Sequence, residues 1–289
     1  MRGAVFNHFR NHFKSLNLRW PSVDNLLFNT LSAEEGVSLI VQFSEEGVKQ
    51  AVWNCGSFKS PGPDGINLGF INDFWELLRE DLLLFFNDFH RHGRLTKGIN
   101  STFIALIPKV EIPQCLSDFR PISLVNCLYK ILSKVLANML RSLLFKVDFE
   151  KAYDSMDWNY LDTVLRRMNF PIVWRKWMME CISTPSVSVL ANGSPTEEFK
   201  LERGLRQGDP LSPFLFLIDV EGLHVMMNSV VEQGMFEPYK VGGHGDVAIS
   251  HLQFVDDTLL MGAKCWGNIR ILKSVLMLFE LSIRVCFMG

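Results

Sequence analysis

Two adjacent aspartates, Asp256 and Asp257, stand in the middle of the otherwise apolar segment HLQFVDDTLLMG at 251–262. Strand-forming residues flank the pair on both sides, which predicts a β-hairpin with both carboxylates at its tip. Aspartate is common in turns, but a two-residue hairpin loop needs positive φ, which glycine and asparagine adopt more readily. The pair therefore indicates a chemical role, with turn formation as the alternative.

A third carboxylate, Asp148, closes the apolar segment SLLFKVDF at 142–149, where aspartate is a poor strand former. Carboxylates at the ends of different strands can converge in a folded protein. Two hard cations about 3.5–4 Å apart require such oxygen ligands and keep positions open for phosphate oxygens. The three aspartates thus predict phosphoryl transfer, in which one ion lowers the pKa of an attacking hydroxyl and the other holds a triphosphate.

Two other motifs for metal or phosphate binding are excluded. DFEKAYDSMDWN at 148–159 is not an EF-hand loop, because Ala152 and Tyr153 occupy positions that require an oxygen ligand and a glycine. The sequence also contains no Walker A motif. A two-metal site built from the three aspartates is the interpretation that these motifs leave.

The spacing of apolar residues predicts the elements that would position these carboxylates. SAEEG and SEEG, near residues 32 and 44, are typical helix starts. The segment 58–70, with two prolines and three glycines, predicts a tight ordered loop, with a linker as the alternative. DFRPISL at 118–124 predicts an extended turn. Helices packed on an antiparallel sheet give an α+β fold. Further helices are expected at about 72–93, 127–141, 154–170, 213–231 and 268–281, and strands at about 101–110, 143–148, 186–201 and 251–262.

Composition limits the class of protein. The chain has 289 residues, of which 48% are hydrophobic, so it can bury a large core in one domain or two lobes. Its longest apolar runs, 82–86 and 213–218, fall short of the roughly 18 residues of a membrane span. The amino terminus has no apolar signal-peptide core. Six cysteines without a CxxC pair or a zinc-type cluster predict reduced core thiols in an intracellular protein.

Charge is distributed unevenly along the chain. The formal net charge is −2, which gives no global sign of a nucleic-acid partner. The segment 93–141 is nevertheless basic, with only Glu111 and Asp118 as acidic residues. Such a segment is either a solvated helix face or a phosphate-binding surface. Its basic residues are Arg94, Lys97, Lys109, Arg120, Lys130, Lys134 and Arg141.

Five motifs occur in a fixed order: SPGPDGI, LIPKV followed by DFRPISL, FKVDFEKAYDSMDW, ERGLRQGDPLSPFLF and HLQFVDDTLLMG. Together they resemble the reverse transcriptase of non-LTR (LINE-type) retrotransposons, most like those of plants, over about residues 48–279. The resemblance implies an α+β right-hand polymerase with fingers and a palm, and an antiparallel palm sheet covered by helices. The thumb is expected to be absent, as a departure from the family pattern. The implied domains are an upstream segment at 1–50, fingers at 51–120, and a palm at 121–289 with an interleaved fingers portion at about 160–205.

The resemblance also implies roles for individual residues. Asp148, Asp256 and Asp257 are similar to the catalytic triad that binds two magnesium ions, or manganese in their place. Tyr153 is similar to the aromatic residue that crowds out a 2′-hydroxyl, with a core aromatic as the alternative. Phe149 is either on the nucleotide side of this site or part of the packing. The remaining nucleotide-binding residues implied are Lys109, Arg120, Gln207 and Gly208.

The implied activity is RNA-directed DNA synthesis, in which a nucleotide passes from a dNTP to the 3′-hydroxyl of a DNA primer on an RNA template. The expected location is the nucleus or the cytoplasm, without a membrane partner, and the sequence sets no oligomeric state. Two departures favour the alternative of an inactive retrotransposon remnant that at most binds nucleic acid. Several dozen residues of the family pattern are missing between Arg141 and Leu143, and the pattern after residue 279 is lost. We therefore expect a truncated, internally deleted domain with weak polymerisation.

Overall fold

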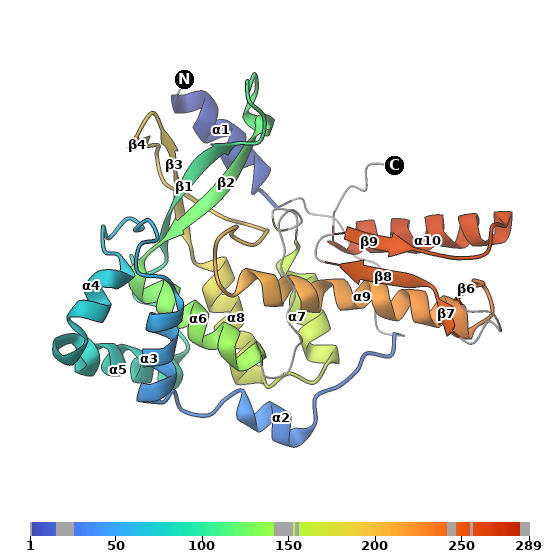
Figure 1. The fold of residues 1–289 in the computed structure, drawn as a ribbon, viewed down its shortest axis with the longest axis horizontal. Helices are drawn as coiled ribbons and strands as arrows, with labels where there is room; N and C mark the ends of the chain where they lie inside the picture. The colour runs from blue at the N-terminus through green and yellow to red at the C-terminus, as the bar shows by residue number, and fades with distance from the viewer. Residues whose placement is uncertain are drawn as a thin grey trace.

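The computed structural model describes residues 2–15, 26–141, 153, 156–241, 247–254 and 257–283. Its β1–β2 hairpin projects from a body of helices, while β8, β9 and α10 lie together alongside α9, away from that hairpin (Figure 1). The helices are α1 (Arg2–His12), α2 (Ala33–Ser38), α3 (Glu45–Asn54), α4 (Leu68–Asp73), α5 (Trp75–His92), α6 (Cys127–Arg141), α7 (Trp158–Arg167), α8 (Ile172–Ser183), α9 (Ser212–Glu232) and α10 (Trp266–Ile283), with a 3₁₀ turn at Leu116–Asp118. The strands are β1 (Ser101–Pro108), β2 (Phe119–Val125), β3 (Ser186–Ala191), β4 (Ser194–Pro195), β5 (Phe199–Lys200), β6 (Tyr239–Val241), β7 (Val247–Ile249), β8 (His251–Phe254) and β9 (Asp257–Leu260).

Short polar side chains cap four of the described helices, α2, α3, α4 and α7. Ser32 caps α2 in a capping box with Glu35, and Ser44 caps α3 by accepting from the backbone N–H of Gly47. The carboxylate of Asp157 accepts from the first-turn N–H groups of α7. Each cap satisfies a backbone donor that the helix itself leaves unpaired. The helix starts predicted from SAEEG and SEEG are therefore confirmed.

Two predictions about helix boundaries were wrong. Asn72 and Asp73 do not cap the helix that follows them, because they lie at the end of α4, and Phe74 joins α4 to α5 without a side-chain cap. The second error concerns 172–183, where α8 follows Pro171 and no element was predicted. Proline has a φ that suits the residue before a helix, so it starts α8 here as well as ending the preceding segment.

The main sheet is mixed, which corrects the prediction of an antiparallel sheet. Its strand order is β2-β1-β3-β4, with β5 also paired to β3. Strands β1 and β2 are antiparallel, whereas β1 and β3 are parallel. DFRPISL forms strand β2 rather than the predicted turn, with Pro121 opposite Leu106. A proline is tolerated there because β2 is an edge strand of the described sheet.

The amino-terminal helix belongs to the packing of this sheet. Val5, Phe9 and Phe13 are buried in a small core with apolar side chains of β1, β3 and β5. The backbone N–H of Glu202 also donates to the carbonyl of Phe13. The first residues therefore cover one face of the sheet, while the domain boundary at residue 50 stays a prediction.

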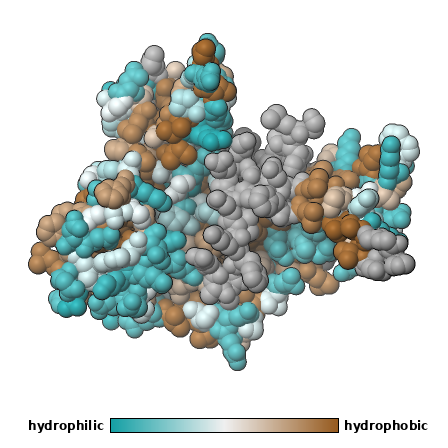
Figure 2. Space-filling view, in the orientation of Figure 1, coloured by the Kyte–Doolittle hydropathy of each residue, from teal (hydrophilic) through white to brown (hydrophobic). Residues whose placement is uncertain are grey.

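The larger core surrounds α6, α7, α8 and α9. Helix α9 is apolar on most of its surface, and within the described chain it is the one helix long and apolar enough to cross a membrane. This corrects the expectation that every apolar run is too short. More than half of its apolar window is buried against the rest of the protein, as in a core helix. Exposed apolar side chains gather instead over α4 and the start of α5 and over the β8–β9 hairpin (Figure 2).

The cysteines are only partly as predicted. Cys55, Cys127 and Cys181 are buried free thiols, and burial raises the pKa of each. Cys115 and Cys265 are exposed, so they are not core residues. These two lie in loops, where no apolar periodicity predicts burial.

Candidate active site

The β8–β9 hairpin places Asp257 at its tip. Phe254 and Asp257 are partners in the antiparallel register, so the chain reverses between them. This confirms the hairpin predicted from the Asp-Asp pair. Asp256, Asp148 and Phe149 lie outside the described residues, and the same holds for the side chain of Asp257. Convergence of the three carboxylates therefore stays a prediction.

A pair of histidines attaches this hairpin to α9. His224 Nδ1 of α9 lies 2.7 Å from His251 Nε2 of β8. Asn228 contacts the other ring nitrogen of His224 at 2.9 Å, and Ser250 Oγ lies 2.8 Å from His251 Nδ1. Burial lowers the pKa of His251, and the nearby His224 lowers it further. The pair holds the hairpin most firmly when at least one of the two rings is neutral.

The Gln207–Gly208 loop lies against strand β2. The backbone N–H of Ser123 donates to the carbonyl of Gln207 at 2.8 Å. Gly208 has a φ of 97°, and a Cβ there would come within 3.2 Å of the Ser123 carbonyl oxygen. Only glycine combines that φ with so close an approach. The close approach that the structure shows is to β2, whereas contact of Gln207 and Gly208 with a nucleotide stays a prediction.

A buried polar network around Arg206 and Asp209 holds the Gln207–Gly208 loop in place. Arg206 Nη2 donates to Asp209 Oδ2 at 2.9 Å, and the side chains are 4% and 3% exposed. Arg206 also donates to Asn100 Oδ1 at 2.6 Å. Tyr129 donates to Asp209 Oδ2 at 2.7 Å, and the guanidinium lies 4.1 Å from the centre of the Tyr129 ring. Through Tyr129, Thr102 and the carbonyl of Cys181, the network joins α6, β1 and α8 to the loop.

Sequence reasoning missed this network. Arg206 and Asp209 flank Gln207 and Gly208 in the motif RQGDP, and both charges come just before the apolar helix α9. A charged pair three residues apart at the edge of a buried segment was a signal for burial as an ion pair. Tyr129 gave no comparable signal, because the apolar face of α6 explained it as a core aromatic.

The two basic residues predicted to meet a triphosphate both lie on the β1–β2 hairpin. Arg120 pairs with Ile107 in the register and shares a sheet face with Ile122, whose Cγ2 would lie 3.7 Å from a Cβ on Gly208. Lys109 follows β1, is exposed, and donates from Nζ to the Ser117 carbonyl at 2.8 Å. Arg120 and the Gln207–Gly208 loop are thus brought to the same strand, while Lys109 lies farther out on the hairpin.

The SPGPDGI segment is the predicted ordered loop and not a linker. Asp64 Oδ2 accepts from the backbone N–H of Cys127 at 2.6 Å, and Asn126 Oδ1 accepts from the backbone N–H of Asp64 at 2.9 Å. A Cβ on Gly62 would lie 2.5 Å from the Val125 carbonyl oxygen, so no side chain fits there. The loop therefore braces the junction between β2 and α6.

Tyr153 is packed against Leu205, just before the Gln207–Gly208 loop, and against α9. Its carbonyl accepts from the backbone N–H of Leu205 at 2.6 Å. Its ring is 3% exposed and packs edge-on against Phe216 of α9 at 5.6 Å. The alternative of a core aromatic describes this packing, and a role beside the nucleotide sugar stays a prediction.

The donor chemistry of the site suits hard cations. The three predicted ligands are aspartates, and carboxylate oxygen is the preferred ligand of magnesium and of manganese. Among the residues that the structure describes, no group of three or more histidine, cysteine or acidic side chains could hold a metal. The described residues therefore offer no rival centre to the one predicted at the tip of β8–β9.

Part of the sequence matches one family of known proteins. Residues 141–280 match the family of reverse transcriptases (RNA-dependent DNA polymerases). The chain is 26% identical over 203 residues to the transposon TX1 uncharacterized 149 kDa protein of Xenopus laevis, which covers 56% of this chain and 16% of that protein.

Two further relatives extend the likeness. The Pol polyprotein from the type-2 retrotransposable element R2DM of Drosophila melanogaster is 25% identical over 247 residues, covering 72% of this chain and 22% of that protein. An uncharacterized mitochondrial protein of Arabidopsis thaliana is 42% identical over 69 residues, covering 24% of this chain and 56% of that protein. The chain thus spans about a fifth of the length of the retrotransposon proteins that it matches.

Proposed function

We propose that this chain, which carries a reverse transcriptase domain of the non-LTR retrotransposon type, synthesises DNA on an RNA template from a DNA primer. The observation that carries the proposal is the seating of the Gln207–Gly208 loop on β2, beside the face that bears Arg120. A rigid strand, a basic side chain and a closely packed backbone are what the binding of a nucleotide against a template requires.

Each residue has a proposed part in nucleotidyl transfer. Arg120 and Lys109 would hold the triphosphate oxygens of the incoming dNTP by charge-assisted hydrogen bonds. Gln207 and Gly208 would lie against the nucleotide and the templating base, and Tyr153 would lie beneath the sugar. Asp148, Asp256 and Asp257 would hold two magnesium or manganese ions. When bound, these ions lower the pKa of the primer 3′-hydroxyl and neutralise charge on the leaving pyrophosphate.

The finer features of the resemblance are also proposals. We propose a plant-type lineage, supported by the likeness to the Arabidopsis thaliana protein. We also propose an internal deletion between Arg141 and Leu143, supported by the start of the family match at residue 141. A displaced reacting group costs on the order of a hundredfold in rate for about 1 Å of error. The domain would therefore polymerise weakly, in the nucleus or the cytoplasm, and a family-like segment grafted between Arg141 and Leu143 would raise its rate.

Primer extension tests the proposal. The full chain is incubated with an RNA template, a labelled DNA primer and dNTPs, with and without magnesium. We expect slow extension that requires magnesium and is lost in Asp257→Asn. The matched control is Asp73→Asn, which removes an exposed carboxylate at the end of α4 and should extend like the parent. Extension that survives in Asp257→Asn, or its absence at every magnesium concentration even after the graft, would refute the proposed activity.

A further inference from the structure

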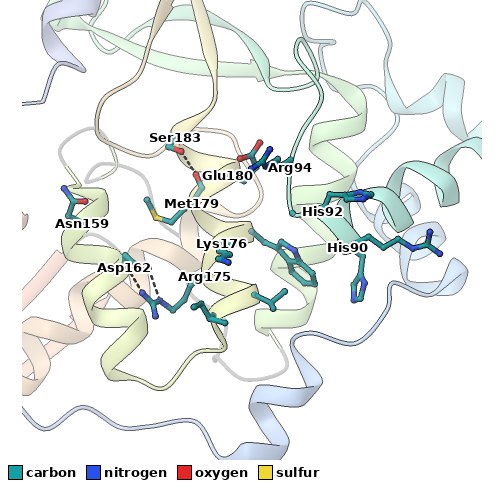
Figure 3. A pocket seen from close by; sticks show the side chains of 15 residues that line it. His90, His92, Arg94, Asn159, Asp162, Arg175, Lys176, Met179, Glu180 and Ser183 are labelled. Carbon is teal, nitrogen blue, oxygen red and sulfur yellow. Dashed lines mark hydrogen bonds and ion pairs between the residues drawn. The ribbon is translucent and has the colours of Figure 1, made fainter.

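A second site of positive charge lies outside the candidate active site. A pocket of about 700 Å³ opens between the end of α5, the side of α7 and the first half of α8 (Figure 3). None of the predicted nucleotide-binding or catalytic residues lines it. We call it the α5–α8 pocket, and its basic residues are Arg91, Arg94, Arg175 and Lys176.

The lining of this pocket is positively charged, whereas the whole chain has a small net negative charge. Its lining holds four arginine or lysine side chains and two carboxylates, whereas the whole chain has 29 basic and 31 acidic residues. Asp162 is already bound to Arg175, with two contacts of 2.9 and 2.6 Å (Figure 3). Glu180 accepts from the backbone N–H of Leu95 at 2.8 Å. The local excess of cations is therefore a property of this surface and not of the composition.

Three of the cations are available to a ligand. Arg91, Arg94 and Lys176 are exposed, and among the described residues none of them forms an ion pair. Arg91 and Arg94 come from α5 and its end, whereas Lys176 comes from α8, so the cations approach the pocket from two elements. Cations that outnumber the carboxylates around them repel one another, and a bound anion lowers that cost.

The backbone holds these cations in place. Gly93 ends α5 with a φ of 61°, and a Cβ there would come 3.1 Å from Trp177 Cδ1, so the turn is packed directly on α8. Ile172 and Val173, the first residues of α8, line the pocket, and α8 has no side-chain cap. The carboxy-terminal end of α5 lines the same pocket, so the opposite partial charges of the two helix ends offset each other and the positive charge comes from the side chains.

We propose that the α5–α8 pocket binds the sugar-phosphate backbone of a nucleic-acid strand outside the polymerase site. The choice of a nucleic acid rests on the proposed function, because a polymerase that copies RNA must hold strands that extend beyond its catalytic site. Guanidinium groups match phosphate oxygens with paired hydrogen bonds, and a lysine adds a point charge. Trp177 is 1% exposed and offers no face for base stacking, so the binding would not depend on base sequence.

Salt-dependent binding tests this inference. Anisotropy of a labelled single-stranded RNA 20-mer is measured with the full chain, without magnesium or dNTPs, over a range of KCl concentrations. In Arg91→Ala/Arg94→Ala/Lys176→Ala we expect the slope of log K against log salt to fall by about two, since each phosphate contact on a single strand contributes about 0.7. At low salt the affinity should fall about tenfold.

A matched triple variant controls for total charge. Lys14→Ala/Arg166→Ala/Lys273→Ala removes the same charge from exposed positions outside the pocket lining. It should bind within about twofold of the parent. Equal weakening by both variants, or no weakening by either, would overturn the proposal. Lys176→Gln alone provides a second variant if the pocket triple fails to fold, with a slope change of about 0.7 expected.

Two further arms separate strand binding from nucleotide binding and from polymerisation. Displacement of the labelled RNA by free dNTP, at dNTP concentrations as low as those at which the RNA binds, would make the pocket a nucleotide site. It would overturn strand binding. The same measurements in an Asp257→Asn background do not depend on polymerisation. Loss of RNA affinity in the pocket variant of that background supports the inference even if primer extension fails. Retained affinity rejects the inference even if primer extension succeeds.

Discussion

Removing the carboxylate of Asp209 should cost far more stability than its single ion pair with Arg206 suggests. In Asp209→Ala the guanidinium stays buried, with neutral acceptors such as Asn100 Oδ1 and the Cys181 carbonyl as its remaining partners. Breaking a buried ion pair by removing one partner costs about 3–5 kcal/mol. The Tyr129 hydroxyl also loses its nearer acceptor, at 2.7 Å, and keeps the Cys181 carbonyl at 3.4 Å; its side chain is fully buried, so the hydroxyl cannot turn to water.

The other ion pair at the same edge of the core gives a matched control. Arg175 and Asp162 are joined at 2.6 Å, but their side chains are 19% and 35% exposed, against 4% and 3% for Arg206 and Asp209. Water can solvate Arg175 once Asp162 is removed, so Asp162→Ala should cost about 1 kcal/mol or less. The contrast between the two variants therefore measures burial, because the chemical groups are the same.

Urea denaturation of the parent and of both variants measures these costs. Asp209→Asn, which keeps the shape and loses the charge, should lie between them at about 1.5–3 kcal/mol. Because the network contacts the Gln207–Gly208 loop, Asp209→Asn should also slow primer extension. A cost for Asp209→Ala no larger than that for Asp162→Ala would refute the reasoning.

Three further predictions concern titration and specificity. Burial raises the pKa of the Asp219 carboxyl, and the charge of Asp157 raises it further, so the stability that this group contributes is full below pH 3.8 and falls as pH rises. In urea titrations, Asp219→Asn should therefore stabilise the protein by about 1 kcal/mol or more at pH 7 and by less near pH 4. The pKa of His251 is lowered, so the stability that this residue contributes to the protein is full above pH 6.5 and falls as pH drops. His224→Gln should reduce this loss of stability between pH 7.5 and 5.5, and an unchanged pH profile would argue against the histidine pair. Tyr153→Val should raise the ratio of ribonucleotide to deoxyribonucleotide incorporation if Tyr153 lies beneath the sugar, and an unchanged ratio would reject that role.

Local residue patterns alone determined much of this protein. Ser32 and Ser44 start their helices because a hydroxyl can satisfy backbone donors within the same turn. Asn192 and Gly193, a residue pair typical of two-residue hairpin turns, form the turn between β3 and β4 with φ values of 52° and 73°. Asp257 opens β9 at the tip of its hairpin, as the flanking strand signals predicted. Each of these features depends on torsions and bonds within a few residues.

Pairings between distant segments were decided only by the tertiary structure. Pro121 made 118–124 look like a turn, yet this segment is a strand because β2 lies at an edge and needs no further partner there. The parallel pairing of β1 with β3 joins segments separated by several helices, and no local pattern specifies it. Arg206 and Asp209 carry the same charges in any conformation. Only the walls supplied by α6, β1 and α8 remove water from them and turn an ordinary charged pair into the support of the candidate site.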